Sequence, residues 1–472
     1  MAESDIALMA HLMRRAGFGA TRDELEAYVA KGYEATVDEL VHPERQPDVD
    51  FDLMERSLPE YGELAGIESN QQSWVYRMVN TKRPLQEKMT LFWHGILCTG
   101  FAKIDYGRMM SIYADLFRRK GLGNYRELIM ELSSHPTMVY YLDNTDNHKD
   151  AINENYGREL LELFTLGVGM DGNFNYTEDD VKAASRAFTG WSVNPALPVF
   201  PYGRSPWSFR FDPTDHDDSE KTFLGKTGRW NGGDIVNMAV EQPATARFIS
   251  RHLYNFFVAD EPQVPAWKDT PPRDPEAIQI LEKAFVDSGY EMSEVMSTLF
   301  NSDFFKNARF QKVKSPAEVV AGTIRLVKDH QQVKPGLFPV MKECTFMGQD
   351  LLNPPTVEGW HTGREWIDSG TLVERINFVA DQVGNLDLPG VQLIASRMTG
   401  DNSITSPEAF VDGCLSLIGP VEVSEKTKEA LVEHAKGGGE IRRGTEEERS
   451  SFARRVGEML QLIVATAEYQ YN

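Results

Sequence analysis

The spacing of hydrophobic residues predicts a chain built mainly of amphipathic helices. In the segment that begins at Thr21, Leu25 and Val29 lie four residues apart and share one helix face. Thr21 and Glu24 have the spacing of a capping box, which marks the start of a helix. Similar patterns recur along most of the chain, and we therefore expect a mainly α fold with a large multi-helix body.

One long segment, 189–234, interrupts the helical pattern. It is rich in Pro, Gly, Trp and Asp and has almost no helical period, so we interpret it as an irregular arm with a few short strands. The arm divides the chain into an N-terminal helical lobe at 1–188 and a C-terminal helical lobe at 235–472, with one continuous domain as the alternative. Long irregular segments are often functional, so a ligand-covering loop and a packed brace between lobes are equally open interpretations.

The charge balance argues against two classes of partner. Lys and Arg number 49 against 71 for Asp and Glu, which gives a formal net charge of −22. Such a chain repels a phosphate backbone at long range, so nucleic acid and anionic membrane are poor partner choices. The apolar runs are broken by charged residues, and we expect no membrane span.

The cysteines and the first residues favour a cytoplasmic location. Cys98, Cys344 and Cys414 are widely spaced and odd in number, so they suggest neither a disulfide framework nor a metal clip. The start of the chain has the acidic residues Glu3 and Asp5 where a signal peptide needs basic ones, and no export signal is visible.

The strongest candidate for chemistry is a polar stripe on a predicted helix from about 155 to 166. Asn155, Arg158, Glu159 and Glu162 fall at intervals of three and four, directly after Glu154. Carboxylates in this arrangement could hold a hard divalent cation. The alternative is a solvated face with internal Arg–Glu pairing.

Two histidines add candidates for proton transfer. Glu87 and His94 lie two helical turns apart, roughly 10 Å, on the helix that Pro84 opens, and could line a cleft. His216 and Asp217 lie in the irregular arm, where they could act as a general base and a metal ligand. The alternatives are a buried, hydrogen-bonded His94 and a carboxylate that caps a turn.

Several segments together form a recognisable pattern. The most specific block is 153–168, continued by 176–181 and 186–191, and the other matching pieces are 11–19, 88–94, 216–217, 221–225, 314–318, 354–355, 359–360 and 460–470. In these segments the chain resembles a bacterial family of unknown function, DUF1800. The resemblance implies a helix-rich body, often encoded near a second uncharacterised bacterial protein whose members commonly carry export signals. It supplies no reaction and no established catalytic residues. The chain departs from the pattern in lacking a leader and in having His361, and a periplasmic location stays open if the native start lies upstream.

Two functions follow from these residues. The first is a metal-dependent enzyme with its site in a helical cleft: Glu154, Glu159, Glu162 and Asp217 hold Mg, Mn, Fe or Ca, while His94 or His216 moves protons and Arg158 holds an anionic group. The second is a non-catalytic assembly or carrier protein acting with the partner gene product, in which the same polar groups fix helix register.

Overall fold

The fold is mainly α, as predicted. The computed structural model describes residues 2–50, 66–194, 206–398 and 404–472. Helices account for 62% of the structure, and only a few short two-stranded sheets accompany them. Within the described ranges, no helix combines the length and the apolar character that crossing a bilayer requires.

The helices of the first part of the chain alternate with short turns. Their bounds are α1 (Glu3–Arg15), α2 (Arg22–Lys31), α3 (Tyr33–Val41), η1 (Pro43–Arg45), α6 (Ile67–Asn80), α7 (Pro84–Ile96), α8 (Phe101–Ile104), α9 (Gly107–Lys120), α10 (Tyr125–Ser133), α11 (Pro136–Tyr141), η2 (Asn144–Asp146), α12 (Asn155–Glu159), η3 (Leu160–Phe164) and α13 (Glu178–Ala187).

The second part is equally helical. Its helices are α15 (Gly232–Val240), α16 (Pro243–Phe257), η4 (Val264–Lys268), α17 (Pro275–Asp287), α18 (Met292–Asn301), α19 (Asp303–Lys306), α20 (Pro316–Val327), α21 (Leu337–Phe346), η5 (Gly363–Trp366), α22 (Ser369–Gly384), α23 (Pro389–Arg397), α24 (Pro407–Leu417), α25 (Glu425–Gly437), α26 (Glu446–Val464) and η6 (Glu468–Gln470).

The strands of the described residues pair two by two in antiparallel fashion. The pairs are β1 (Gly169–Met170) with β2 (Asn173–Phe174), β3 (Trp191–Val193) with β4 (Phe209–Phe211), β5 (Lys221–Phe223) with β6 (Lys226–Gly228), and β7 (Ile404–Thr405) with β8 (Ile441–Arg442). The predicted arm at 189–234 therefore contains two hairpins, although its residues 195–205 lie outside the described residues. Phe223 of this arm is fully buried, and its packing ties the second hairpin to the helical body.

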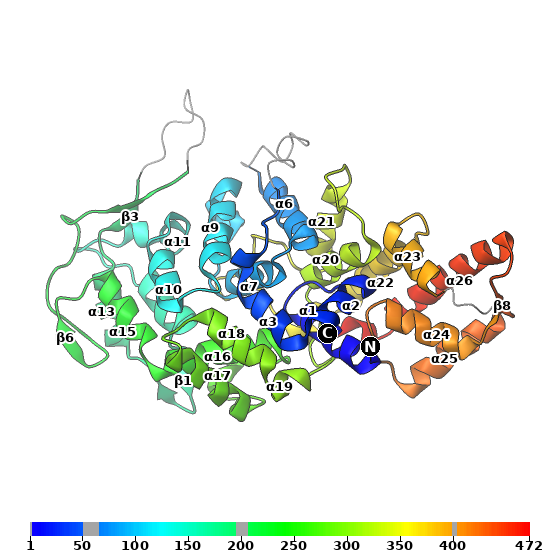
Figure 1. Ribbon diagram of the computed structural model, residues 1–472. Helices are drawn as coiled ribbons and strands as arrows, with labels where there is room; N and C mark the ends of the chain where they lie inside the picture. Colours follow the sequence, from blue (N-terminus) through cyan, green and yellow to red (C-terminus); the bar gives the residue numbers. More distant parts are fainter. Residues whose placement is uncertain (1, 51–65, 195–205, 399–403) are drawn as a thin grey trace, which may run out of the picture.

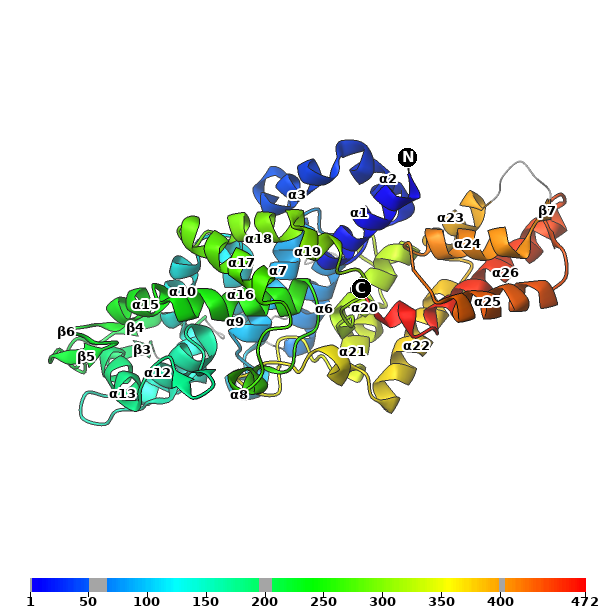
Figure 2. The same cartoon turned by 90° about the horizontal axis from the view of Figure 1, so that it is seen from below.

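The helices form an elongated body around two hydrophobic cores. In Figures 1 and 2, α13 and α15 lie toward one end and α24–α26 at the other, with α1 and α7 between them. The first core joins α1–α3 to α10–α19, and the second joins α6 to α20–α26. Helix α7 serves both, because Phe92 and Trp93 belong to the first core and Leu91 to the second.

Each hydrophobic core combines helices that lie far apart in the sequence. Residues 235–308 contribute to the first core together with the N-terminal helices, while the second core draws on 317–464. The domain boundaries at 189 and 235 remain a prediction. The C-terminal segment after α26 returns to the middle of the molecule, close to α1 and α20 (Figure 1). There Tyr471 pairs with Val313.

Candidate functional site

A buried ion pair joins the two cores at the centre of the molecule. Lys88 of α7 donates to Glu318 of α20, and the two side chains are 0% and 5% exposed. Lys88 also donates to the carbonyl of Gly17 at 2.8 Å. Ser315 starts α20 with a capping box, and this places the Glu318 carboxylate against the backbone N–H of Ser315 at 2.6 Å. The position of Glu318 is therefore fixed by a local signal and by a distant lysine.

Electrostatics keep this pair charged. Burial lowers the pKa of Lys88 to about 8, although the nearby Glu318 favours its charged form. Burial alone would raise the pKa of Glu318, but Lys88 and Arg15 hold it at about 2. Both groups are ionised at neutral pH.

Two cavities share Glu318 as a lining residue. The first, which we name the basic cavity, has a volume of about 70 Å³ and is lined on its polar side by Arg14, Lys314, Thr323 and Tyr469. The second, which we name the tryptophan cavity, has a volume of about 150 Å³, and its lining includes His252, Gln349, Glu358, Trp360, His361 and Trp366.

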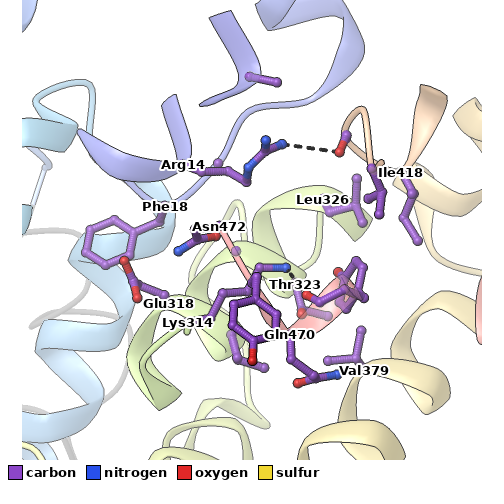
Figure 3. A pocket seen from close by; sticks show the side chains of 18 of the residues that line it. Arg14, Phe18, Lys314, Glu318, Thr323, Leu326, Val379, Ile418, Gln470 and Asn472 are labelled. Carbon is purple, nitrogen blue, oxygen red and sulfur yellow. Dashed lines mark hydrogen bonds between the residues drawn. The ribbon is translucent and has the colours of Figure 1, made fainter. Parts of the chain in front are cut away.

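The basic cavity is lined by residues from distant parts of the sequence. Arg14 belongs to the last turn of α1, Lys314 precedes α20, and Tyr469 belongs to η6. In Figure 3, Arg14 reaches over the cavity from one side while Lys314 rises from the other. The two cations thus face a common space.

Arg14 is only partly satisfied by the protein. Its Nη1 donates to the carbonyl of Gly419 at 3.2 Å, and the guanidinium lies over the Phe310 ring, 5.1 Å from the centroid. Its Nε and Nη2 are buried, and neither finds an acceptor among the described residues. Burial, followed by repulsion from Arg15, lowers the pKa of Arg14 to about 10. Buried donors without partners are rare in folded proteins, so these two require an explanation.

Lys314 lies beneath the C-terminal segment. Its Nζ donates to the carbonyl of Tyr469 at 2.6 Å and lies 3.8 Å from the centroid of the Tyr469 ring. Burial, followed by the charge of Arg14, lowers the pKa of Lys314 to about 7. The ammonium form is therefore less favoured here than at an exposed lysine.

The region around Glu318 carries more positive than negative charge. Its cations are Arg14, Arg15, Lys88, Arg309, Lys312, Lys314 and Arg375, and the carboxylates among them are Glu318, Asp260 and Glu422. Arg375 is fully buried, and its Nε and Nη2 lack acceptors in the described part of the chain, as does Nη1 of Arg15. This local excess of positive charge contrasts with the net charge of −22 for the whole chain.

The tryptophan cavity is lined in part by α7, through Leu91, Phe92, Gly95 and Ile96. Gly359 has a φ of +89°, and a Cβ there would fall 2.1 Å from the carbonyl of Gly95, so glycine allows the loop to approach α7. The next residue, Trp360, stacks on His94 with centroids 5.5 Å apart. Trp360 Nε1 and His252 Nε2 are buried, and the described residues offer neither a hydrogen-bond partner.

The structure places His94 and Glu87 in the interior. His94 is 0% exposed and contacts the rings of Trp74, Tyr113, Phe117 and Trp360. Neither of its ring nitrogens has a partner in the described ranges, and burial lowers its pKa to about 3. Glu87 accepts from Arg118 Nε at 2.6 Å and from Trp74 Nε1 at 3.2 Å. The helix therefore carries a neutral histidine among aromatic rings and, two turns away, a buried ion pair.

The predicted helix at 155–166 is an α-helix from Asn155 to Glu159 and continues to Phe164 with a different hydrogen-bond pattern. Residues Leu160–Phe164 wind as a π-helix, and Thr165 Oγ1 donates to the carbonyl of Leu160 at 2.6 Å. A single π turn is a recurrent feature of functional sites, and it changes the spacing of side chains along the helix face.

The carboxylates of the stripe separate into two groups. Glu154 pairs with Arg158 at 3.3 Å, and Arg158 pairs with Glu178 at 2.7 Å, all partly in solvent. Glu159 is half-buried, and burial, with the charges of Glu162 and Glu358 adding to it, raises its pKa to about 7. Tyr176 donates its hydroxyl to Glu162 at 3.2 Å.

His216 and Asp217 attach the arm to α13. His216 Nδ1 lies 2.9 Å from the carbonyl of Thr189, and Asp217 accepts from Arg186 Nε at 2.6 Å. Arg186 and Ser219 hold the pKa of Asp217 well below its usual range despite its partial burial. Across the described residues, no three His, Cys, Asp or Glu side chains lie close enough together to hold a metal ion. The predicted site residues stay predictions, and the structure does not gather them into one cluster.

Sequence reasoning missed Arg14, Lys314 and Tyr469. Each lies in a segment that resembles DUF1800 or borders one, but no pattern in the sequence indicates that the three meet. A family model described as "Protein of unknown function (DUF1800)" matches residues 11–471. The chain belongs to the DUF1800 family. No curated protein and no solved structure matched it. In this DUF1800 chain both cavities lie almost entirely within the matched range.

Proposed function

We propose that this DUF1800 protein binds a small organic anion in the basic cavity. The observation that carries the proposal is the guanidinium of Arg14, whose buried Nε and Nη2 lack an acceptor among the described residues. An anionic oxygen placed beside them would supply charge-assisted hydrogen bonds, which are among the strongest in proteins. It would also offset the local excess of positive charge around Glu318.

The size and lining of the cavity define the ligand further. A volume of about 70 Å³ has room for roughly five water molecules or a small organic molecule. Most of the remaining wall is apolar, and it includes Ala10, Phe18, Val319, Leu326, Val379 and Ile418. A short carboxylic acid, with its carboxylate at Arg14 and its carbon chain against this wall, matches both features.

A thermal-shift panel tests the proposal. The full chain is heated with acetate, propionate, pentanoate, sulfate and chloride at equal ionic strength. A ligand that binds only the folded state at about 100 times its Kd adds about 2.7 kcal/mol of stability. We expect pentanoate to raise the Tm and acetate to raise it less, because the apolar wall contributes to binding.

Matched variants separate the cavity from general salt effects. Arg14→Gln removes the charge and shortens the side chain, and it should abolish most of the pentanoate shift. Arg229→Gln removes an exposed arginine paired with Asp218 and should leave the shift unchanged. An equal shift in all three proteins, or a shift that only follows ionic strength, would refute the proposal.

The metal-dependent enzyme is a second candidate, supported by the environment of Glu159. Its carboxylate lies near Glu162 and Glu358, at a π turn, and its pKa is raised to about 7. A divalent cation such as Mg, Mn, Fe or Ca would favour the ionised carboxylates and could activate water. The roles of His94, His216, Arg158, Glu154 and Asp217 remain part of this candidate.

A carrier that works with a partner is compatible with anion binding. A protein that only holds the anion for a second bacterial gene product would need the cavity and no reaction. We also propose a cytoplasmic location, supported by the cysteines of the chain: Cys98, Cys344 and Cys414 are all free and buried.

A further inference from the structure

Lys314 differs in its partners from Lys88 and Lys312, the two other lysines near Glu318. Lys88 faces Glu318, and Lys312 Nζ lies 2.9 Å from a carboxylate oxygen of Asp260. No carboxylate of the described residues lies within ion-pair distance of Lys314, whose Nζ contacts the carbonyl and ring of Tyr469. The cavity therefore holds one lysine whose positive charge no ion pair stabilises.

The surroundings of Lys314 favour a free amine. The guanidinium of Arg14 faces the same cavity, and the apolar wall excludes much of the water that would solvate an ammonium group. With its pKa lowered to about 7, roughly half of the Lys314 side chains are uncharged at neutral pH. An ordinary surface lysine is almost entirely protonated there and is a poor nucleophile.

The geometry also leaves the nitrogen lone pair usable. A neutral amine has two N–H bonds and one lone pair. One N–H can keep its hydrogen bond to the carbonyl of Tyr469, while the lone pair turns toward the cavity. A ligand held by Arg14 would then present its carbon chain to this nitrogen.

We propose that Lys314 forms an imine with the carbonyl carbon of a small oxo acid whose carboxylate is bound by Arg14. This inference rests on the proposed anion site and names the substrate class of that site. The geometry behind it is a single cavity, with a carboxylate-binding guanidinium on one side and an amine without an ion-pair partner on the other.

The step is balanced without any further reactant. The lone pair of Lys314 Nζ attacks the carbonyl carbon and forms a C–N bond, giving a carbinolamine. The C–O bond then breaks, and the oxygen leaves as water with the two protons that the amine carried. The product is an imine, with no change in oxidation state, and addition of water reverses the step.

Borohydride trapping tests the inference on the full chain. The protein is incubated with pyruvate or 4-oxopentanoate, treated with sodium borohydride, and measured by intact mass and peptide mapping. We expect one reduced adduct per chain, located at Lys314, with Lys88 and Lys312 unmodified. Excess pentanoate, which binds the cavity but has no ketone, should suppress the adduct.

Variants and controls keep the outcomes distinct. Lys314→Arg keeps a positive charge and should lose the adduct, while Lys182→Arg at an exposed position should retain it. If Lys314→Arg does not fold, peptide mapping of the borohydride-treated wild-type chain still shows whether the adduct is at Lys314. Adduct spread evenly over surface lysines, or no adduct at Lys314, overturns the inference. If pentanoate nevertheless binds in an Arg14-dependent way, the anion site stands without the imine; if pentanoate does not bind, the proposed function itself fails.

Discussion

Lys88 and Glu318 form a buried ion pair across 230 residues of sequence, and Glu318 lines the cavities on both sides of it. The pair links α7, which serves both cores, to α20. A buried ion pair is weak evidence for stability, because desolvation offsets the attraction. Here its clearer effect is positional, since it fixes the wall between the basic and tryptophan cavities.

Removing either partner of the Lys88–Glu318 pair should lower the free energy of unfolding, and the loss should differ between the two variants. Lys88→Met leaves Glu318 buried but still near Arg15 and Lys312, and we expect a loss of about 3 kcal/mol in the free energy of unfolding. Glu318→Gln removes the shared counter-charge of several cations and should cost more. Urea unfolding of the two variants provides the comparison. A milder effect from Glu318→Gln would contradict the charge balance described for this region.

The stability of the chain should carry a pH signature of Lys314. Its pKa is about 7 when folded and near 10.5 when unfolded, so between these values the unfolded state binds more protons. The resulting penalty is full below pH 7 and is relieved as the pH rises toward 10. Lys314→Met should therefore gain stability relative to the wild type at pH 6 and lose that advantage by pH 10. Urea unfolding at pH 6, 8 and 10 measures the difference, with Lys182→Met as the exposed control; a constant difference would be inconsistent with a buried, titrating Lys314.

His94 should contribute to acid sensitivity. Its pKa is lowered to about 3 from 6.5, so between these values the unfolded state binds more protons and stability falls as the pH drops. His94→Phe keeps an aromatic ring in the shell of Trp74, Tyr113 and Trp360 and removes two unpartnered nitrogens. We expect a shallower loss of stability between pH 6.5 and 4, measured by urea unfolding at each pH. An unchanged slope would mean that His94 does not stay neutral in the folded protein.

Divalent cations give a direct test of the Glu159 carboxylates. With its folded pKa near 7, Glu159 destabilises the metal-free protein as the pH rises from about 4.5 to 7, because the folded state then holds the extra proton. Glu159→Gln should therefore stabilise metal-free protein at pH 8.

If the metal-dependent candidate is correct, Mg²⁺, Mn²⁺ or Ca²⁺ should raise the Tm of the wild type at pH 8 and leave a Glu159→Gln, Glu162→Gln double variant unaffected. Elemental analysis of protein purified without chelator provides the stoichiometry. Equal shifts in both proteins would remove this candidate and leave the anion site untouched.

Local signals in the sequence predicted much of the fold. The capping box at Thr21 begins α2, because a side chain three residues away decides the start of the helix. The composition of 189–234 predicted short strands, and two hairpins are found there. The π turn after Glu159 was not predictable from hydrophobic period, because the period indicates a helix but does not say which backbone groups are hydrogen-bonded within it.

The two cavities could not be predicted from the sequence, for a different reason. Arg14, Lys314 and Tyr469 meet only because the C-terminal segment returns to the centre of the molecule, and such long-range packing has no periodic signature. His94 was a candidate because of its residue type and its position on a helix, whereas the structure encloses it among aromatic rings. The residues proposed for binding are instead Arg14, in the last turn of α1, and Lys314, which precedes α20.

Isothermal titration of the full chain with pentanoate tests the central claim most directly. The account predicts one saturable site per chain, a Kd about 10- to 100-fold weaker in Arg14→Gln, and no change in Arg229→Gln, because a charged hydrogen bond contributes about 1.5–3 kcal/mol. Absence of saturable binding to the wild type, or equal affinity in Arg14→Gln, would contradict it.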